Sequence, residues 1–330
     1  MGSSTPQPPS AEFIAAFRTA GGGPEPVPFD RFMRAALYDP RAGYYRRGGA
    51  RIGRSPGTDF FTASSSGALF GRLVAEACAQ LLPGRDPGHF EFVEIGAEPG
   101  GGILEGVAHP FRSARTIRLG EPLCISGACV VFSNELFDAQ PFRRFVLRAG
   151  AWRETGVALD GERLVELELP SPGALPPGLP ASAREGYRID APLEAADLLR
   201  TIAGQPWTGL LVAFDYGKTW REISEETPAG TARAYRAHRL SADLLSNPGW
   251  QDLTCHVCWD WLAKAARDCG FAEPKVEFQE SFLVRYSSRE VARVVESSAG
   301  RPTPEKAAVM QLIHPAHMGQ KFQVMWTARG

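Results

Sequence analysis

Hydrophobic positions along the chain follow two kinds of spacing, and each kind predicts a different element. Apolar residues three and four apart are typical of one face of a helix, whereas short apolar runs and alternation are typical of strands. Helical spacing predicts helices near residues 13–17, 29–37, 69–77, 193–202, 261–265 and 307–312. Apolar runs or alternation predict strands near residues 90–95, 129–132, 145–169, 209–214, 281–284 and 322–326. The sequence therefore predicts a chain of mixed helices and strands.

The predicted strand that ends at Ile95 leads into a glycine-rich segment. Residues 96–102 read GAEPGGG, and a helix is predicted from about Ile103. A strand, a glycine loop and a helix in this order let the backbone approach a nucleotide-like ligand closely. The acidic Glu94 on the strand argues against dinucleotide phosphates and suits a cationic or amino-acid part of a ligand.

A second predicted strand ends in a cluster of polar residues. The apolar run at 129–132 is followed by Asn134, Glu135 and Asp138. Ligands of open α/β sheets bind beyond the carboxyl ends of strands, so this cluster is a candidate site. The alternative interpretation is that Asn134 caps a helix while the two carboxylates are solvated.

Composition narrows the class of protein. The 330 residues suggest about two domains, and 36 basic against 37 acidic residues give a net charge of −1. A protein that binds nucleic acid through phosphates usually has a basic excess, so we expect no nucleic-acid partner. No stretch approaches the roughly 18 apolar residues of a membrane span, and no leader pattern is visible at Met1. We expect a bacterial cytoplasm or an organelle matrix.

Cysteine and histidine residues give little support for a metal site. The six cysteines include one CxxC, formed by Cys255 and Cys258 around His256. Zinc would need two further well-spaced ligands, so we predict no metal. Tyr235 and His238 lie in the basic, aromatic segment 230–239, where a lone histidine is more often a surface or packing residue than a catalyst.

Several motifs in order resemble one family. In the first half of the chain these motifs are LYDP and GYY in residues 37–45, DFFTA at 59–63, EIGA at 94–97 and SNELFDA at 133–139. In the second half they are DYG at 215–217, GT at 230–231 with Tyr235 and His238, QDLT at 251–254 and HV at 256–257. Gln279, Phe282, Pro315 and Phe322 continue the series. From about Phe29 to Trp326 the chain resembles the MidA-like S-adenosylmethionine-dependent methyltransferases, whose mitochondrial members are complex I assembly factors that act on protein arginine.

The resemblance implies a Rossmann-like class I methyltransferase core with added helical and antiparallel strand regions. It implies an N-terminal helical region 11–85 over the cofactor site and a core 86–330 with insertions at about 143–205 and 220–260. Residues 1–10 are polar and rich in proline, so we expect this segment to be flexible. The oligomeric state stays open, and the partner is a protein substrate or assembly partner.

The resemblance also assigns site residues. Those expected at S-adenosylmethionine are Thr62, Glu94, Gly96, Ala97, Gly100, Glu121 and Asn134. Those expected to act on the substrate are Glu135, Asp138, Tyr235 and His238. Glu135 and Asp138 are three apart, so on a helical turn they would share one face and bind a planar guanidinium together.

The sequence also departs from the family. Glu98 and Pro99 stand in the glycine loop, and only 32 positions separate Gly102 from Asn134, too few for a full set of βα units. We expect one helix near 103–112, one strand near 115–119, a trimmed sheet and a weakened cofactor site, with Glu121 as the remaining candidate for the ribose hydroxyls. The alternative function is a catalytically silent binding or assembly protein; a nicotinamide oxidoreductase is disfavoured by the glycine pattern.

Overall fold

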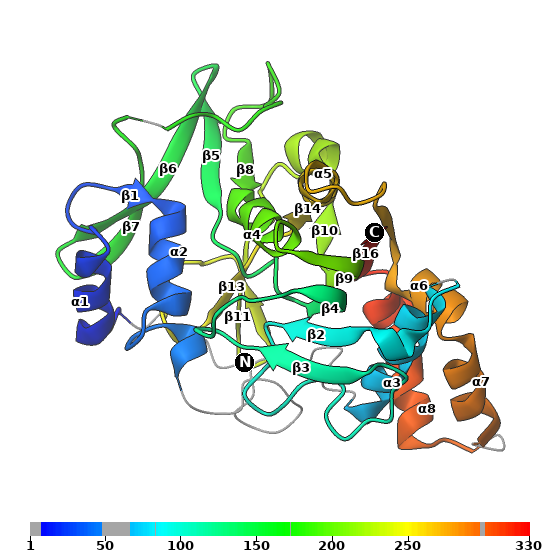
Figure 1. Cartoon of the computed structure of the whole chain (residues 1–330). Coiled ribbons are helices and arrows are strands. Elements are labelled where there is room, and N and C mark those ends of the chain that lie inside the picture. Colours follow the sequence, from blue (N-terminus) through cyan, green and yellow to red (C-terminus); the bar gives the residue numbers. More distant parts are fainter. Residues whose placement is uncertain (1–7, 48–66, 83, 172, 298–300) are drawn as a thin grey trace. The chain divides into compact units, whose positions relative to one another are not determined.

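The computed structural model describes residues 8–47, 67–82, 84–171, 173–297 and 301–330 (Figure 1). The chain divides into two compact units. The first comprises residues 1–60, 138–195 and 218–258, and the second comprises residues 61–137, 196–217 and 259–330. The region predicted to be helical at 11–85 therefore contributes to both units.

The second unit is built on a six-stranded mixed sheet. Its strands, in spatial order, are β15 (Lys275–Phe278), β16 (Gln323–Arg329), β9 (Trp207–Asp215), β4 (Gly127–Asn134), β2 (Glu91–Ile95) and β3 (Ser113–Ile117). β9, β4, β2 and β3 are parallel, and β16 runs antiparallel to both of its neighbours. This confirms the α/β class I methyltransferase core. Beyond β2 the described residues supply one strand, β3, so the expected trimming of the sheet is confirmed.

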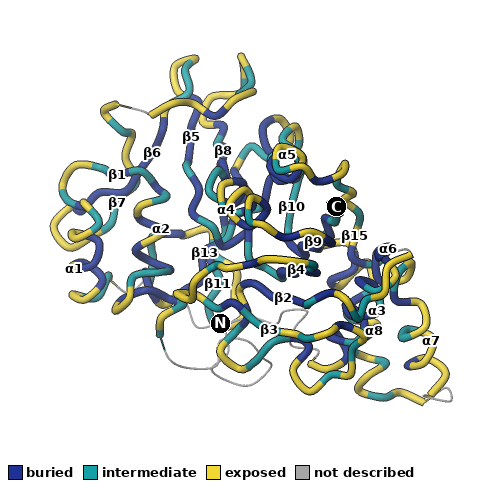
Figure 2. Tube along the Cα trace, in the orientation of Figure 1, coloured by how far each residue is buried: buried dark blue, intermediate teal, exposed yellow. Residues whose placement is uncertain are grey.

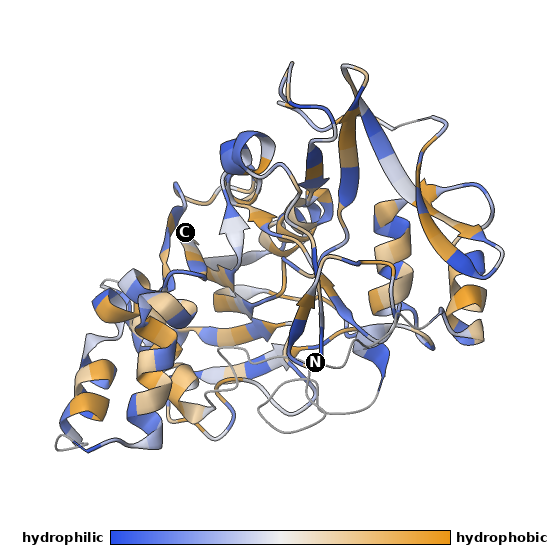
Figure 3. Cartoon of the chain, turned by 180° about the vertical axis from the view of Figure 1, so that it is seen from behind, coloured by the Kyte–Doolittle hydropathy of each residue, from blue (hydrophilic) through white to orange (hydrophobic). Residues whose placement is uncertain are grey.

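A group of helices covers one face of this sheet. They are α3 (Ala68–Gln80), α6 (Gln279–Tyr286), α7 (Ser288–Ser297) and α8 (Pro304–Ile313), which pack against one another at one side of the sheet in Figure 1. Hydrophobic and hydrophilic segments alternate along them (Figure 3), as expected for helices that bury one side. The strand predicted at 281–284 is wrong, because Phe282 and Leu283 are buried in the core from α6. A short apolar run does not separate strand from helix.

The rest of the second unit connects these elements. Helix α5 (Trp259–Asp268) packs on β16, and the short helices η3 (Pro87–His89) and η5 (Pro315–Gly319) lie next to β2 and β16 in the sequence. Helix α4 (Leu193–Ala203) carries the chain from the first unit into the second. The short strands β10 (Gly217–Lys218) and β14 (Val257–Cys258) lie where the chain passes between the units.

The first unit combines helices with antiparallel strands. Its N-terminal helices are α1 (Ala11–Thr19), α2 (Phe29–Tyr38) and η1 (Tyr44–Arg46). Its first sheet contains β1 (Val27–Pro28), β6 (Ala151–Asp160), β5 (Arg143–Arg148) and β8 (Arg188–Ala191), with β7 (Arg163–Glu168) paired to β6. After η4 (Glu222–Glu226), a second sheet contains β12 (Arg239–Ser241), β11 (Arg233–Arg236) and β13 (Asp252–Thr254). The antiparallel strands predicted over 145–169 are confirmed.

Buried aromatic rings and one ion pair hold the first unit together. The rings of Phe29 and Phe142 stack with centroids 5.0 Å apart. The guanidinium of Arg144 lies 4.9 Å from the centroid of the Phe29 ring. Arg144 Nε donates to Asp190 Oδ1 at 2.7 Å, and Asp190 Oδ2 also accepts from the backbone N–H of Thr231 at 2.7 Å. Because Asp190 is fully buried, these bonds are needed to offset the cost of taking its charge out of water.

The two sides of β2 are built differently. β4 and β9 are buried along most of their length, whereas β3 is mostly half-exposed, as the burial colours show (Figure 2). Residues 96–112 are all described and form turns and extended segments without a helix. The helix predicted from Ile103 is therefore wrong. Pro99, Pro110 and the glycines at 100–102 and 106 disfavour helix, and the turn leaves no room for one before β3.

Candidate functional site

The carboxyl ends of three parallel strands meet at one edge of the sheet in the second unit. Ile95 of β2 lies opposite Ser133 of β4, and Asn134 of β4 lies opposite Phe214 of β9. The segments that begin at Gly96, Glu135 and Tyr216 therefore leave the sheet side by side. This is the edge at which open α/β sheets bind ligands.

Glu94 is held beneath the glycine loop. Its side chain is 7% exposed, and Oε2 accepts a hydrogen bond from the backbone N–H of Ile103 at 2.7 Å. Burial raises the pKa of this carboxyl to about 7, and the hydrogen bond and the charge of Arg118 offset only part of that effect. A Cβ at Gly102 would lie 2.7 Å from the same oxygen, so only glycine fits there without displacing Glu94.

Gly96 allows the glycine loop to pack closely on Leu136, which lies in the segment after β4. Its φ of +83° lies in the left-handed region, and a Cβ would lie 2.9 Å from Cδ1 of Leu136. Ala97 follows and is buried, whereas a Cβ at Gly100 would meet no atom within 4 Å. The first part of the loop is therefore closely packed, and the part at Gly100 borders open space.

Asn134 and Glu135 form a polar pair at the end of β4. Asn134 Nδ2 donates to Glu135 Oε1 at 3.0 Å, while Asn134 Oδ1 is buried with no hydrogen-bond partner among the described residues. Glu135 has a φ of +52°, which is rare for a residue with a side chain. Backbone strain of this kind clusters at functional sites.

Asp215 fixes the turn that follows Glu135. It is fully buried at the end of β9, and its Oδ2 accepts from the backbone N–H of Phe137 at 2.9 Å. Residues 135–140 form bends and a turn instead of a helix. The predicted helical face shared by Glu135 and Asp138 is therefore wrong, and so is the alternative that Asn134 caps a helix.

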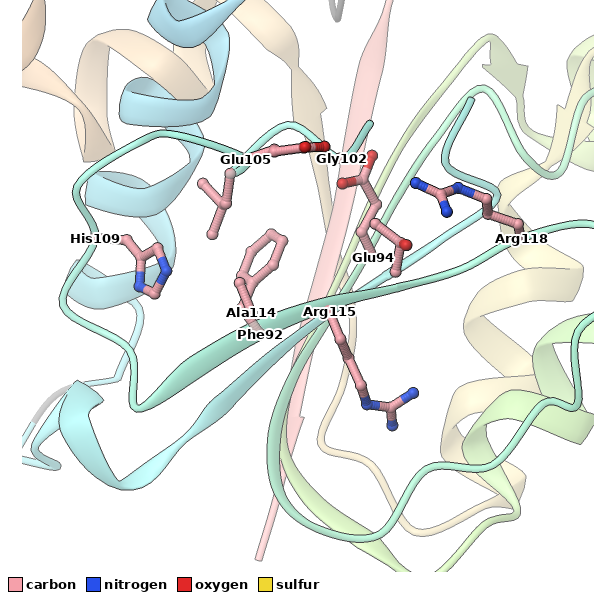
Figure 4. A pocket seen from close by; sticks show the side chains of 10 residues that line it. Phe92, Glu94, Gly102, Glu105, His109, Ala114, Arg115 and Arg118 are labelled. Carbon is pink, nitrogen blue, oxygen red and sulfur yellow. The ribbon is translucent and has the colours of Figure 1, made fainter. Parts of the chain in front are cut away.

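A cavity of about 310 Å³ opens beside the glycine loop (Figure 4). Its lining comes from β2, β3, the turns between them and the residue that follows β3, and consists of Phe92, Glu94, Gly102, Leu104, Glu105, His109, Ala114, Arg115, Thr116 and Arg118. Such a volume is at the lower end of the range for small-molecule sites. The sequence did not single out most of these residues, because they come together only when the segment 102–109 folds over the sheet.

Glu121 lies outside the lining of this cavity. Its Oε2 accepts a hydrogen bond from the backbone N–H of Arg118 at 2.7 Å, and its own N–H donates to the carbonyl of Arg118 at 3.0 Å. The carboxylate thus closes the turn after β3. The side chain that faces the cavity from the carboxyl end of β3 is that of Arg118.

Three predicted substrate residues belong to the first unit. Asp138 is 3% exposed, and its carbonyl accepts from the N–H of Cys255 at 2.9 Å. Tyr235 lies on β11 opposite Asp252 of β13, and His238 is in the following turn with a φ of +60°. Thr62 lies outside the described residues. Among the other predicted residues, those at the ends of β2 and β4 belong to the second unit: Glu94, Gly96, Ala97, Gly100, Asn134 and Glu135.

The tyrosines of the LYDP and GYY motifs hold Asp252 and the segment after Asp138. Tyr45 Oη donates to Asp252 Oδ1 at 2.8 Å, and Tyr38 Oη donates to the carbonyl of Ala139 at 2.7 Å. The two rings stack with centroids 5.5 Å apart. The motif thus has an internal structural role that its sequence did not reveal.

His256 is a half-buried histidine of the first unit. Burial, together with the positive charges of Lys218 and Arg233, lowers its pKa to about 4, so it is neutral at physiological pH. Its neighbours Cys255 and Cys258 are buried thiols outside any disulfide. Within the described ranges, no three or more His, Cys, Asp or Glu residues are grouped to hold a metal ion.

Comparison with known proteins supports the same fold. The family model whose description reads "Putative S-adenosyl-L-methionine-dependent methyltransferase" matches residues 115–275. The mitochondrial protein arginine methyltransferase NDUFAF7 of Danio rerio is 24% identical, with 92% of this chain and 84% of the relative covered. Its Xenopus tropicalis counterpart is 24% identical, with 90% and 81% covered.

Solved structures agree over the whole length. A Burkholderia thailandensis protein crystallised with S-adenosyl-homocysteine is 26% identical, with a TM-score of 0.81 and with 98% of this chain and 95% of that chain covered. A native structure from the same organism gives 25% identity, a TM-score of 0.77 and the same coverage. The chain is therefore similar over nearly its whole length to the MidA-like S-adenosylmethionine-dependent methyltransferases.

Proposed function

We propose that this protein binds S-adenosylmethionine at the carboxyl edge of β2 and β4 and methylates a protein side chain, that of arginine. The observation that carries the proposal is the buried Asn134 Oδ1, an acceptor without a partner in the described chain, beside Glu135 and the glycine loop. An orphaned buried acceptor costs about 1–3 kcal/mol, which a ligand donor would recover.

The residues at this edge fit the cofactor. Glu94 and Asn134 offer oxygens to its cationic amino-acid part, and Gly96 and Gly100 let the backbone approach it. When bound, S-adenosylmethionine supplies an electrophilic methyl group on a sulfonium, so the protein mainly has to orient a nucleophile that loses a proton as it takes the methyl.

Glu135 is the residue at this edge best suited to an arginine. Asn134 Nδ2 fixes one of its carboxylate oxygens, and the strained backbone at Glu135 is held by its N–H, which donates to the carbonyl of Phe214 at 2.9 Å. A fixed carboxylate can accept hydrogen bonds from a planar guanidinium and orient one of its nitrogens. We propose Asp138, Tyr235 and His238, in the first unit, as further substrate residues.

The choice of arginine is supported by the names of the zebrafish and frog relatives, which are mitochondrial protein arginine methyltransferases. We propose a bacterial cytoplasm or an organelle matrix as the location. No helix of the described residues has the length and apolar character that a membrane crossing requires.

The test is methyl transfer from methyl-labelled S-adenosylmethionine into a protein extract of the source organism whose own copy of the gene is deleted. Label in methylarginine after acid hydrolysis would support the proposal. Glu135→Gln should lower the rate by at least tenfold while cofactor binding is retained. Label in another amino acid would refute the arginine assignment, and no transfer despite cofactor binding would favour the silent protein.

The silent binding protein remains the second candidate, because one observation favours it. Glu94 is tied to the backbone of Ile103 and Glu121 to that of Arg118, so two of the expected cofactor carboxylates already have partners inside the chain. Such a protein would have no measurable methyl transfer and would act through a protein partner.

A further inference from the structure

A proline-rich connection joins β7 to β8 in the first unit. Residues 176–180 read PPGLP, and the described residues between Leu169 and Tyr187 form turns and bends without helix or strand (Figure 1). Among the described residues of the range 170–183, no backbone atom is hydrogen-bonded to another backbone atom. Long connections of this kind are usually functional or disordered. The path of this one therefore depends on side chains of neighbouring elements.

Two tryptophan side chains bind this connection through its carbonyl groups. Nε1 of Trp152, on β6, donates to the carbonyl of Pro180 at 2.9 Å. Nε1 of Trp220, just before η4, donates to the carbonyl of Gly178 at 3.0 Å. Water can solvate the carbonyls of a surface loop, so two indole donors directed at one short segment indicate a binding site for its backbone.

Both tryptophans are held in place by the rest of the first unit. The Trp152 ring packs edge to face with the buried ring of Tyr187, with centroids 6.2 Å apart. Two reciprocal hydrogen bonds fix the backbone around Trp220. The N–H of Thr219 donates to Glu222 Oε2 at 2.7 Å, and the N–H of Glu222 donates to Thr219 Oγ1 at 3.2 Å. Donors that are already positioned lose little conformational freedom when a ligand binds.

The seated segment shows the class of ligand that this pair of tryptophans accepts. Residues 177–180 read PGLP, so two prolines are three apart. Proline favours the polyproline II conformation, whose backbone carbonyls have no internal hydrogen bonds, and aromatic grooves are the usual receptors for such segments. The backbone passes close to Trp220, since a Cβ at Gly178 would lie 2.9 Å from its Nε1.

The segment is an imperfect ligand for its own site. It turns at Gly178, where φ is +76°, so it is not a continuous polyproline II helix. Pro176 is buried, whereas Leu175 and Pro177 are exposed. A proline-rich segment without the turn would offer carbonyls to both indoles and keep its favoured conformation throughout. Such a segment can therefore compete with residues 174–180.

We propose that Trp152 and Trp220 form a docking site for a proline-rich segment of a partner protein, and that residues 174–180 occupy this site until the partner displaces them. The seated segment is the observation that identifies the chemistry of the partner. The proposal goes beyond the proposed function, because all of these residues belong to the first unit and the docking requires neither the cofactor nor methyl transfer.

The test is isothermal titration calorimetry of the full chain with two peptides. One has the sequence of residues 173–182, and the other is decaproline, which has no turn. Gly178→Ala should lift the chain's own segment from Trp220, because the added Cβ has no room and the positive φ disfavours alanine. Both peptides should bind this variant at least fivefold more tightly than the unaltered chain, since the site no longer has an occupant. Decaproline should bind more tightly than the loop peptide.

Further substitutions are made in the Gly178→Ala chain. Trp152→Phe and Trp220→Phe keep a ring and remove the N–H donor, so each should weaken binding by about fivefold, the effect of one neutral hydrogen bond. Trp250→Phe is the matched control, because this tryptophan is 51% exposed and stacks with the guanidinium of Arg47. It should leave binding unchanged, and the loop peptide with its three prolines replaced by alanine should not bind.

Thermal melting of every variant separates lost binding from lost folding. If Trp152→Phe unfolds because its contact with Tyr187 is weakened, Trp220→Phe carries the test. No binding of either peptide to the Gly178→Ala chain, or binding that the tryptophan substitutions leave unchanged, would overturn the proposal. Equal affinities of the unaltered and Gly178→Ala chains would refute the displacement of residues 174–180.

A second copy of the chain is the other source of the same proline-rich segment. Sedimentation of the unaltered chain at rising concentration distinguishes the two. A monomer throughout is the expected result. A dimer that decaproline dissociates would assign the site to the segment of a second copy and overturn the assignment to a partner protein.

Discussion

The sheet extends unequally on the two sides of strand β2: β4, β9, β16 and β15 follow on one side, and among the described residues β3 alone lies on the other. Toward β4 and β9, the sheet is buried, and the rings of Phe92 and Phe132 stack with centroids 5.6 Å apart. Toward β3, the sheet ends after one five-residue strand that is largely half-exposed. The difference indicates that the sheet keeps a buried core while its β3 side is reduced, because that core lies on the β4 side of β2.

The two sides of β2 contribute different residues to the candidate site. On the β4 side, Asp215 and Asn134 position a turn around Glu135. On the β3 side, a cavity lined by Arg118 and His109 occupies the sheet face that the turns at 102–109 cover. If this difference between the two sides holds, substitutions on the β4 side should mainly change the free energy of unfolding. Substitutions on the β3 side should mainly change ligand binding.

The largest effect is expected at Phe132. This fully buried ring also contacts the rings of Phe70 and Phe214, so Phe132→Ala should lower the free energy of unfolding by about 3–5 kcal/mol. Urea denaturation followed by circular dichroism measures it. A loss below 1 kcal/mol would show that the β4 side is not the stability core.

A pH-dependent effect is expected at Glu94. Its pKa is about 7 in the folded protein against an ordinary 4.5, so between these values the folded chain holds a proton that the unfolded chain releases. The contribution of Glu94 to the free energy of unfolding is therefore fully present below pH 4.5. As the pH rises through 7, this contribution is lost, and the free energy of unfolding falls by about 3 kcal/mol. Glu94→Gln should remove this loss, so its stability relative to the unaltered chain should rise between pH 5 and pH 8. Equal pH dependence of the two proteins, measured by urea denaturation, would contradict the assignment.

A smaller effect is expected at Asp215. Asp215→Asn keeps one acceptor oxygen of two, and the N–H groups of Phe137 and Tyr216 both bind this carboxylate at 2.9 Å. The loss of one such bond should lower the free energy of unfolding by about 1–2 kcal/mol. Because the same bonds hold the turn after Glu135, methyl transfer should fall more than cofactor affinity. Equal falls in both would indicate a general loss of structure.

The smallest effect on stability is expected at Thr116. Thr116→Val on the half-exposed β3 should change the free energy of unfolding by less than about 0.5 kcal/mol, as is usual for such positions. The same denaturation series measures it. A change as large as that of Phe132→Ala would remove the contrast between the two sides of β2.

The sequence predicted the elements whose signals are local. Helix α2 and strands β2, β4 and β9 follow from hydrophobic spacing. The trimmed sheet follows from the short span between Gly102 and Asn134. The helix near Ile103 was predicted wrongly, because the backbone of Ile103 is bound by Glu94 from nine residues away, a contact that spacing does not encode. Helix α6 was mistaken for a strand because its apolar run is short.

The site was only partly predictable for the same reason. The residues at the ends of β2 and β4 could be found, because they follow strands directly. The positive φ of Glu135 and the arrangement of Arg118 and His109 around one cavity depend on packing between segments, so no local pattern marked them. Glu121 was named because the family carries an acidic residue at the end of this strand, and its side chain accepts the hydrogen bond that closes the turn at Arg118.

The most direct test of the account is calorimetric titration of the unaltered, full-length protein with S-adenosylhomocysteine. The account predicts one saturable site per chain, and a melting temperature that rises as ligand is added, because a ligand at 100 times its dissociation constant stabilises the fold by about 2.7 kcal/mol. No heat of binding and no change in melting at millimolar ligand would contradict it, and would mean that the shortening on the β3 side removed the cofactor site.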